Sequence, residues 1–396
     1  MQHTDAPPNE GKPGLREGFT TGSAAAAAAK AATVFALTGE VLAVVDIPLP
    51  IHAIKAASGH APAGASADRL TIPVEAVHDD GMSVRAAVIK DGGDDPDATH
   101  GARIEAVVTL DPAFSGVGPH VLIDGATGVG RVTLPGLPVP VGKAAINPGP
   151  EGQIRAAVLE ALPEDFKGIA LVFIEVPEGE AIARHTLNPR LGIVGGISIL
   201  GTGGIVRPYS HAAWAAAVSQ SLDVARAQGH TACACTTGRR TERFFLAQNP
   251  AVPELCCIQA ADHYAHALRE AQAKGFRTLV WAVFFGKLVK QAQGFASTHA
   301  REAELDFALL AAWAREAGAD EATGQAIAGA NTAMQAHALL EHAPEVRARL
   351  TEGLVRRAKA AAASFAPGLD VRYQVFDLTD ATGATVLYAD ELSGAF

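Results

Sequence analysis

The spacing of hydrophobic and polar positions divides the chain near residue 209. Residues 20–39 are rich in Ala, begin with Thr and Ser and end at a glycine, which is typical of a capped helix. Hydrophobic runs of strand length follow, and clusters of Gly, Pro and Asp separate them. These runs cover residues 41–50, 69–78, 82–90, 103–110 and 169–177. The pattern predicts an α+β domain over residues 15–209, with mostly antiparallel strands.

The second half of the chain alternates strands with helices. The strand-like runs cover residues 231–235, 254–260, 278–285 and 371–378. Helices are predicted over residues 211–228 and 262–274, and two long helical stretches over about 300–365. Such alternation is typical of a parallel sheet with helices on both faces, so we predict a Rossmann-like α/β domain over residues 210–396. Residues 1–14 are polar and rich in Pro and Gly, which predicts a disordered tail.

The composition limits the partners of the protein. The chain has 396 residues, with 32 Lys and Arg against 42 Asp and Glu, and a formal net charge of −10. Nucleic acids and anionic membranes attract positively charged proteins, so neither is an expected partner. Residues 1–14 lack the features of a signal peptide, and the apolar run 24–29 is too short to span a bilayer. The four cysteines do not form a disulfide framework, which favours a cytoplasmic protein, and no protein-bound metal is expected.

Ligands of doubly wound sheets bind beyond the carboxyl ends of the strands, so the loops after the predicted strands are candidate sites. Thr236, Thr237 and Gly238 follow one strand, where a glycine lets the backbone approach a ligand and a helix N-terminus attracts an anion. Asp262 follows the next strand, at about the position where an acidic residue binds ribose hydroxyls. The G-x-G-x-x-G pattern is missing, and the alternative is a plain turn at Gly238 and a helix N-cap at Asp262.

The loop after strand 278–285 contains two lysines and a histidine. Lys287 and Lys290 are three residues apart, so one helix face would present both to the carboxylates of an anionic substrate. His299 follows, and an imidazole titrates near neutral pH, as a proton shuttle requires. The alternative is a solvated lysine face and a structural histidine.

Two loops of the first half are candidates as well. Gly201, Thr202 and Gly203 belong to a Gly-rich stretch, which indicates either close approach to a ligand or a tight hairpin. Asp94 and Asp95 lie in an Asp-rich loop whose spacing does not fit an EF-hand. One of these carboxylates could act as a general base, and the alternative is an Asp-rich turn.

Five long segments of the chain resemble the CbiD family, the cobalt-precorrin-5B C-1 methyltransferases of cobalamin biosynthesis. They are LREGFTTGSAAAAAAKAA (15–32), VIKDGGDDPDATHG (88–101), GLPVPVGKAAINP (136–148), NPRLGIVGGISILGTGGIVRP (188–208) and GKLVKQAQGFASTHAR (286–301). The resemblance implies methyl transfer from S-adenosylmethionine to C-1 of cobalt-precorrin-5B, a ring-contracted tetrapyrrole, which gives cobalt-precorrin-6A. Two positions depart from the family pattern: Ala24 stands where relatives carry Cys, and residues 282–285 stand where they carry Gly-His.

The resemblance gives each group of candidate residues a role. The methyl donor would contact Thr236, Thr237, Gly238, Asp262, Gly201, Thr202 and Gly203. The carboxylates of the tetrapyrrole call for cations, because Arg and Lys hold carboxylates through charge-assisted hydrogen bonds, and Arg207, Arg239, Lys287 and Lys290 would supply them. Thr20, Thr21 and Gly22, in the first segment of the resemblance, would also contact the substrate. Proton transfer would fall to His299, Asp94 or Asp95.

Two other functions stay open from the sequence. A non-catalytic protein of the same pathway could bind or channel the tetrapyrrole, and a nicotinamide-dependent precorrin reductase could use the same sheet. The missing G-x-G-x-x-G pattern counts against the reductase. Assembly with a second copy of the chain, or with other enzymes of cobalamin biosynthesis, is also compatible with the sequence.

Overall fold

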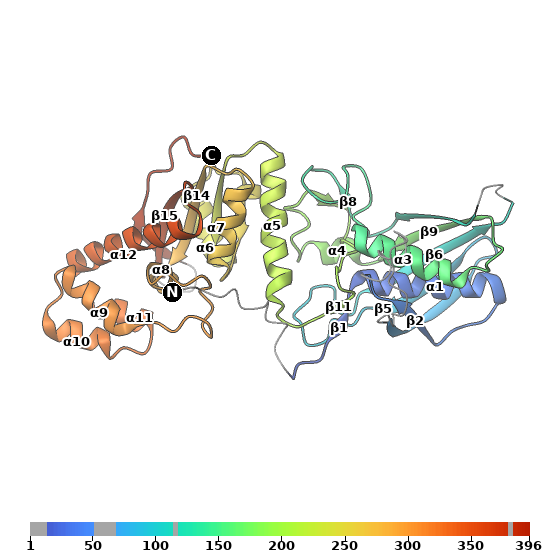
Figure 1. Ribbon diagram of the computed structural model, residues 1–396, viewed down its shortest axis with the longest axis horizontal. Helices are drawn as coiled ribbons and strands as arrows, with labels where there is room; N and C mark the ends of the chain where they lie inside the picture. The colour runs from blue at the N-terminus through green and yellow to red at the C-terminus, as the bar shows by residue number, and fades with distance from the viewer. Residues whose placement is uncertain (1–13, 51–68, 114–117, 379–382) are drawn as a thin grey trace. The chain divides into compact units, whose positions relative to one another are not determined.

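The computed structural model describes residues 14–50, 69–113, 118–378 and 383–396 of the chain. The chain divides into two compact units, Met1–Ala212 and Ala213–Phe396, which we call unit 1 and unit 2 and describe separately (Figure 1). Apart from Gly14, the segment predicted as a disordered tail lies outside the described residues. Within those residues, no helix is long and apolar enough to cross a bilayer.

Unit 1 is built on a five-stranded sheet. The strands lie in the order β4 (Ala76–Asp79), β5 (Val84–Ile89), β6 (Arg103–Asp111), β9 (Ile169–Glu175) and β7 (His120–Gly125). Three of the four pairings are antiparallel, and only β7 runs parallel to its neighbour β9. The predicted α+β architecture with mostly antiparallel strands is confirmed.

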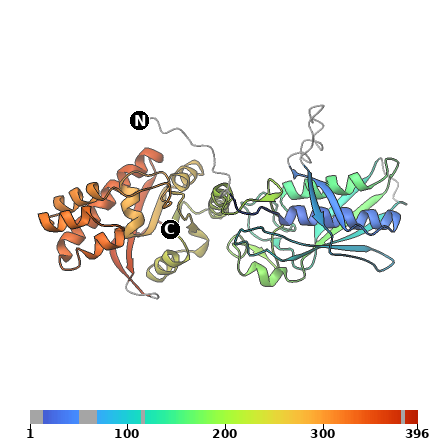
Figure 2. The same ribbon diagram turned by 90° about the horizontal axis from the view of Figure 1, so that it is seen from below.

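Two helices, α1 (Thr21–Thr38) and α3 (Pro148–Ala161), lie side by side and belong to the same core as this sheet (Figure 2). The alanines of residues 24–29 are completely buried in α1. Alanine has the highest helix propensity and the smallest side chain that still excludes water, so α1 packs closely on every side. Thr20 caps the helix, and Gly39 ends it with φ of 71°, as the sequence predicts.

Short strands join distant segments of unit 1. β1 (Gly18–Phe19) pairs with β11 (Ile205–Val206), and β8 (Arg131–Val132) pairs with β10 (Ile193–Val194). β2 (Val44–Pro48) pairs with β3 (Arg69–Pro73), and α4 (Gly179–Ala183) is a short helix before β10. Because β10 and β11 pair with different strands, the hairpin alternative for residues 201–203 is wrong.

Unit 2 contains a second five-stranded sheet. The strands lie in the order β13 (Cys257–Gln259), β12 (Ala232–Thr236), β14 (Thr278–Phe284), β15 (Asp370–Leu378) and β16 (Ala384–Ala389). The first four strands are parallel, and β16 is antiparallel to β15. In chain order the parallel strands are arranged 2-1-3-4, the order of a flavodoxin-like doubly wound sheet. The topological switch point therefore lies between β12 and β14.

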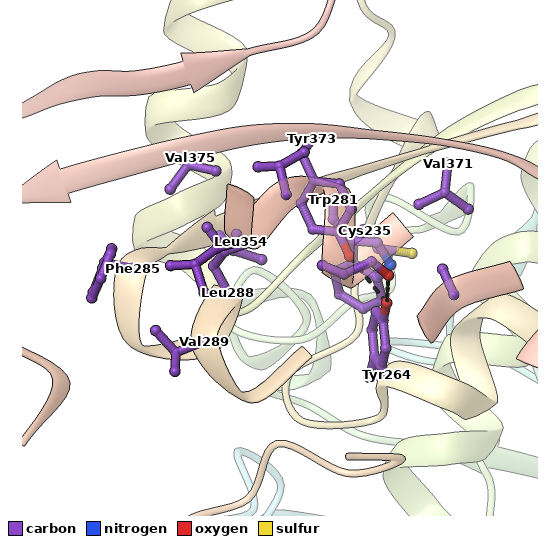
Figure 3. Close-up of a cluster of buried hydrophobic side chains, with 14 of the residues drawn as sticks. Cys235, Tyr264, Trp281, Phe285, Leu288, Val289, Leu354, Val371, Tyr373 and Val375 are labelled. Atoms are coloured by element: carbon purple, nitrogen blue, oxygen red, sulfur yellow. Dashed lines mark hydrogen bonds between the residues drawn. The ribbon is translucent and has the colours of Figure 1, made fainter. Parts of the chain in front are cut away.

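Helices cover both faces of the second sheet. α6 (Arg239–Gln248) packs on one face, where Phe245 contacts a small core with Ala234 and Ala282. The other face carries the larger core, to which α5 (His211–Ala227), α7 (Tyr264–Ala273), α8 (Phe285–Ala292) and α12 (Pro344–Phe365) contribute. Figure 3 shows Trp281 and Tyr264 in this core, where the Tyr264 and Tyr373 hydroxyls lie 3.0 Å apart.

Two sequence predictions for unit 2 need correction. Residues 300–365 form four helices instead of two: α9 (Phe307–Glu316), α10 (Glu321–Ala328), α11 (Ala333–Ala338) and α12. Separate caps start the first three, because Asp306, Asp320 and Thr332 each accept a backbone N–H in the first turn. The predicted strand 254–260 begins as a 3-10 helix, Glu254–Cys256, so only three of its residues pair as β13.

The four cysteines are buried free thiols. Cys233 and Cys235 belong to the larger core of unit 2, and Cys256 and Cys257 to the smaller core beneath α6. Burial raises the pKa of Cys256 to about 12, so this thiol stays protonated and packs as a small apolar group. Among the described residues, no three His, Cys, Asp or Glu side chains gather as a metal site would require.

A buried ion pair closes the Asp-rich loop of unit 1. Lys90 is 2% exposed, and its Nζ lies 2.5 Å from Asp97 Oδ2. Asp97 Oδ1 also accepts hydrogen bonds from the Thr99 backbone and hydroxyl, each at 2.7 Å. Burial raises the pKa of Asp97, but Lys90 and Thr99 outweigh burial and lower it. The ionised pair therefore fixes the base of the loop that carries Asp94 and Asp95.

We expect Asp97→Asn to lower the free energy of unfolding by about 3 kcal/mol, because it leaves the Lys90 ammonium buried without a counter-charge. Urea denaturation followed by far-UV circular dichroism measures the change. The matched control is Asp124→Asn, which breaks the exposed pair with Arg131 and should cost about 1 kcal/mol or less. The folded pKa of Asp97 is lowered, so its contribution is present at neutral pH and disappears as the pH falls below about 3.9. Equal losses in the two variants would contradict the assignment.

Candidate functional site

The carboxyl ends of β12, β13 and β14 bring three predicted segments of unit 2 together. Thr236 ends β12, Asp262 follows β13, and Lys287 lies in the first turn of α8, directly after β14. Since parallel strands end at the same sheet edge, these residues meet although they lie far apart in the chain. We call the cluster of Asp262, Lys287, Lys290 and Thr298 the edge site.

A strained turn presents Asp262. The backbone N–H groups of Ala260 and Ala261 both donate to Thr236 O, at 2.9 and 3.2 Å. Ala261 has φ of 49°, in the left-handed region that residues with a Cβ seldom adopt. The chain therefore turns sharply at the end of β13, and Asp262 leaves the sheet toward α8. Its predicted alternative as a helix N-cap is wrong, because α7 begins at Tyr264 with His263 as its N-cap.

Asp262 is held through one of its two carboxylate oxygens. Oδ1 accepts a hydrogen bond from the Thr298 hydroxyl at 2.9 Å and forms an ion pair with Lys287. Oδ2 accepts no hydrogen bond from the residues that the structure describes, and the side chain is 24% exposed. A carboxylate with one oxygen fixed and the other open is suited to accept hydrogen bonds from a ligand.

The two lysines of α8 converge on one backbone oxygen. Lys287 Nζ lies 3.2 Å and Lys290 Nζ 3.0 Å from Thr298 O. Burial, and after it the neighbouring Lys290 ammonium, lowers the pKa of Lys287 to about 8. Burial also lowers the pKa of Lys290. Within the described residues, Asp262 forms an ion pair with Lys287, and Lys290 contacts the Thr298 backbone oxygen instead. One positive charge is therefore left for an anionic ligand to neutralise.

The turn after β12 lies at the N-terminus of α6. Thr241 Oγ1 accepts the Thr237 N–H at 3.1 Å and donates to Gly238 O at 2.9 Å. Gly238 has φ of 147°, and a Cβ built there would meet no atom within 4 Å, so the glycine is required by conformation and not by crowding. The Thr236 hydroxyl is buried and has no hydrogen-bond partner within the described part of the chain. Arg239 opens α6 with an exposed side chain.

His299 directly follows the edge site. Its Nδ1 accepts the Arg301 N–H at 3.3 Å, and its own N–H donates to Ser297 Oγ at 3.3 Å. Sequence reasoning missed two residues here, Thr298 and Ala261. Thr298 contacts Asp262 only because the chain folds back between α8 and α9. No local pattern indicates the left-handed conformation of Ala261.

In unit 1, Asp94 and Asp95 accept hydrogen bonds from backbone amides. Asp94 Oδ2 accepts from Arg16 N at 2.7 Å, and Asp95 Oδ1 from Tyr209 N at 2.8 Å. Tyr209 has φ of 59°, which a non-glycine residue adopts only when its surroundings hold it there. Both carboxylates thus anchor neighbouring segments, and their role as general base stays a prediction.

The predicted substrate residues at the start of α1 contact the Gly-rich segment. Thr21 Oγ1 accepts Leu200 N–H at 2.9 Å, and Gly22 N–H donates to Leu200 O at 3.2 Å. Gly201 has φ of 133°, and a Cβ there would overlap the side chain of Thr20. Thr202 and Gly203 are exposed.

Arg207, the predicted substrate-binding arginine of unit 1, forms an ion pair within unit 1. Its Nε lies 3.3 Å from Glu17 Oε1, across the β1–β11 pair. Both side chains are about half exposed, so the pair is open to solvent and to exchange of partners.

A flavodoxin-like sheet with a charged cluster at its carboxyl edge is typical of an α/β domain that binds a small anionic or nucleotide-like ligand. Sequence models of the CbiD family match the chain in two places. The model described as CbiD matches residues 8–208, and the model described as CbiD, C-terminal domain, matches residues 297–384. The chain belongs to the CbiD family.

Curated relatives extend over almost the whole chain. A protein of Nitratidesulfovibrio vulgaris named cobalt-precorrin-5B C(1)-methyltransferase is 51% identical over 385 residues, 96% of each chain. A protein of Geobacillus kaustophilus with the same name is 46% identical over 336 residues, 84% of this chain and 85% of its own. The crystal structure of a cobalamin biosynthesis protein (cbiD) from Archaeoglobus fulgidus is 28% identical, with a TM-score of 0.37, over 69% of this chain and 78% of that one.

We expect Lys290→Met to raise the pKa of Lys287 above about 8, because it removes the neighbouring positive charge that disfavours the protonated amine. Carbon-13 NMR of the reductively methylated lysines, titrated from pH 6 to pH 11, measures the pKa. Lys167→Met, at an exposed position of unit 1, is the control and should leave the titration of Lys287 unchanged. If Lys287 titrates identically in both variants, the Lys290 charge does not lower the pKa of Lys287.

Proposed function

We propose that the chain is an S-adenosylmethionine-dependent methyltransferase that methylates C-1 of cobalt-precorrin-5B and yields cobalt-precorrin-6A. Membership of the CbiD family and the shared name of relatives that are 51% and 46% identical support the reaction. The observation that carries the site is the edge site, where Asp262 and two lysines meet at the carboxyl edge of the sheet. Cobalt belongs to the substrate in this proposal, and no metal bound by the protein itself is expected.

For the methyl donor we propose the end of β12 and the turn after β13. Asp262 Oδ2 would accept hydrogen bonds from the ribose hydroxyls, since Oδ1 is already engaged. Gly238 leaves room for the donor next to the backbone, and Thr236 and Thr237 flank it. Gly201, Thr202 and Gly203 of unit 1 stay predictions from the sequence for donor binding.

For the tetrapyrrole we propose the basic residues of the edge site. Asp262 pairs with Lys287, and Lys290 donates to the backbone oxygen of Thr298, so a carboxylate of the substrate would neutralise the charge of Lys290. Arg239, at the start of α6, lies near the same edge. In unit 1, Arg207 would exchange Glu17 for a substrate carboxylate, beside Thr20, Thr21 and Gly22.

The chemistry needs positioning more than acid catalysis. S-adenosylmethionine supplies an electrophilic methyl group on a sulfonium, and orienting two reactants can contribute about 7–11 kcal/mol to rate acceleration. The ring gains the methyl group at C-1 and loses a proton, which a base must accept. We propose His299 as that base because it adjoins the edge site, with Asp94 and Asp95 as the second choice because backbone amides already occupy them.

The proposed setting is the cytoplasm, where the four buried thiols would remain reduced. Assembly with a second copy or with other enzymes of cobalamin biosynthesis is part of the same proposal. Size-exclusion chromatography with light scattering would measure whether the chain forms a homo-oligomer.

We expect the protein, incubated with S-adenosylmethionine and cobalt-precorrin-5B, to yield a product heavier by one methyl group, and mass spectrometry measures it. Donor carrying a labelled methyl should pass the label to the product. A tetrapyrrole that binds but gains no label would favour the channelling protein instead. Reduction of the ring with NADPH, without label transfer, would favour the reductase.

We expect Asp262→Ala to weaken S-adenosylmethionine binding at least tenfold, equivalent to about 1.4 kcal/mol, because the variant loses the open carboxylate oxygen. Isothermal titration calorimetry measures the affinity. The matched control is Asp223→Ala, which removes another lysine-paired carboxylate of unit 2, that of Lys274, and should bind the donor as the wild type does. Unchanged affinity in Asp262→Ala would remove Asp262 from the donor site.

A further inference from the structure

The backbone N–H, the hydroxyl and the carbonyl oxygen of Thr298 all form hydrogen bonds with other residues of the edge site. Its N–H donates to Asp262 O at 3.0 Å, and its hydroxyl donates to Asp262 Oδ1 at 2.9 Å. Its carbonyl oxygen accepts from Lys287 Nζ at 3.2 Å and from Lys290 Nζ at 3.0 Å. One residue thus connects the acidic side of the site with both of its basic groups.

The position of Thr298 makes this connection rigid. The residue is 1% exposed, in a segment without regular secondary structure between α8 and α9. Ala265 N donates to Ala296 O at 2.9 Å, so α7 holds the same segment two residues earlier. The backbone contacts do not involve the hydroxyl, which leaves the hydroxyl one distinct task, the bond to Asp262 Oδ1.

That bond decides which way the carboxylate of Asp262 faces. Lys287 alone would allow the carboxylate to rotate, because an ammonium group donates to either carboxylate oxygen with little directional preference. The hydroxyl adds a second donor to the same oxygen, so Oδ1 is fixed and Oδ2 faces away from Thr298. A fixed acceptor loses less conformational freedom when a ligand binds.

We propose that Thr298 is a positioning residue of the donor site: its hydroxyl orients Asp262 so that Oδ2 receives the hydroxyl groups of the ligand. The proposal rests on the proposed function and deepens it, since it names the residue that acts through Asp262. Thr298 touches no reacting atom in this scheme. Its removal should therefore change the affinity for the donor and leave the turnover of bound substrate nearly unaltered.

The test compares Thr298→Val, which keeps the shape and loses the hydroxyl, with Thr298→Ser, which keeps the hydroxyl. We expect Thr298→Val to raise the Kd and KM for S-adenosylmethionine about tenfold with little change in kcat, and Thr298→Ser to restore the affinity to within about twofold of the wild type. The matched control is Thr351→Val, a buried threonine of α12 whose hydroxyl bonds to Arg347 O. Calorimetry and steady-state kinetics measure these values, and thermal unfolding reports the fold. If Thr298→Val does not fold, Thr298→Ala makes the same comparison.

A double-mutant cycle separates positioning from a merely structural role. If Thr298 acts through Asp262, Thr298→Val should weaken donor binding no further in the Asp262→Ala background. Additive losses, or an unchanged affinity in Thr298→Val, would overturn the proposal.

The titration of Lys287 keeps the two proposals distinguishable. Wild-type protein that binds no S-adenosylmethionine contradicts the proposed function, and the titration then decides the role of Thr298 by itself. Thr298→Val removes a donor from the carboxylate that pairs with Lys287, so the pKa of Lys287 should differ from that of the wild type, whereas in Thr298→Ser it should not. Identical titrations in the three proteins would overturn the inference about Thr298 whatever the donor is.

Discussion

The edge site depends on one contact between segments 36 residues apart, the hydrogen bond from the Thr298 hydroxyl to Asp262. Parallel pairing of β12 with β13 brings the turn after β13 next to Thr236, and the left-handed Ala261 directs Asp262 toward α8. β14 leads directly into α8, so Lys287 and Lys290 reach the same place. The ion pair of Lys287 with Asp262 already joins the acidic and basic sides, and the Thr298 hydroxyl adds a second donor to the same carboxylate oxygen.

Charge explains why this cluster is suited to an anion. The chain has a net charge of −10, and much of its positive charge is neutralised locally. Lys90 pairs with Asp97, and Lys274 contacts both Asp223 and Glu270. The edge site differs, because Asp262 pairs with Lys287 while the neighbouring Lys290 donates to the backbone oxygen of Thr298. An acidic protein that binds a polyanion needs such local excess of positive charge, and burial makes the excess more costly until the anion arrives.

The sequence predicts the architecture well and the site in part. The spacing of hydrophobic positions and the composition are enough to predict an antiparallel sheet in unit 1 and a parallel sheet in unit 2. Ligands of parallel sheets bind beyond the carboxyl ends of the strands, and this rule leads to Asp262 and Lys287. The number of helices in residues 300–365 is not evident from the sequence, because an Ala-rich stretch has high helix propensity throughout. The caps at Asp306, Asp320 and Thr332 divide the stretch. Thr298 could not be found, since its role consists entirely of contacts that the tertiary fold creates.

The family motifs themselves divide into two physical classes. In unit 1 many motif residues serve close approach of backbones: a Cβ at Gly18 would collide with Asp91 O, and one at Gly93 with Arg16 O. There the Asp-rich loop and the start of the chain interlock, and Asp94 completes the contact by accepting Arg16 N–H. In unit 2 the motif 286–301 instead carries the partly buried charges of Lys287 and Lys290. A fold gains nothing from two ammonium groups converging on one carbonyl oxygen, so this arrangement is better explained by the ligand than by stability.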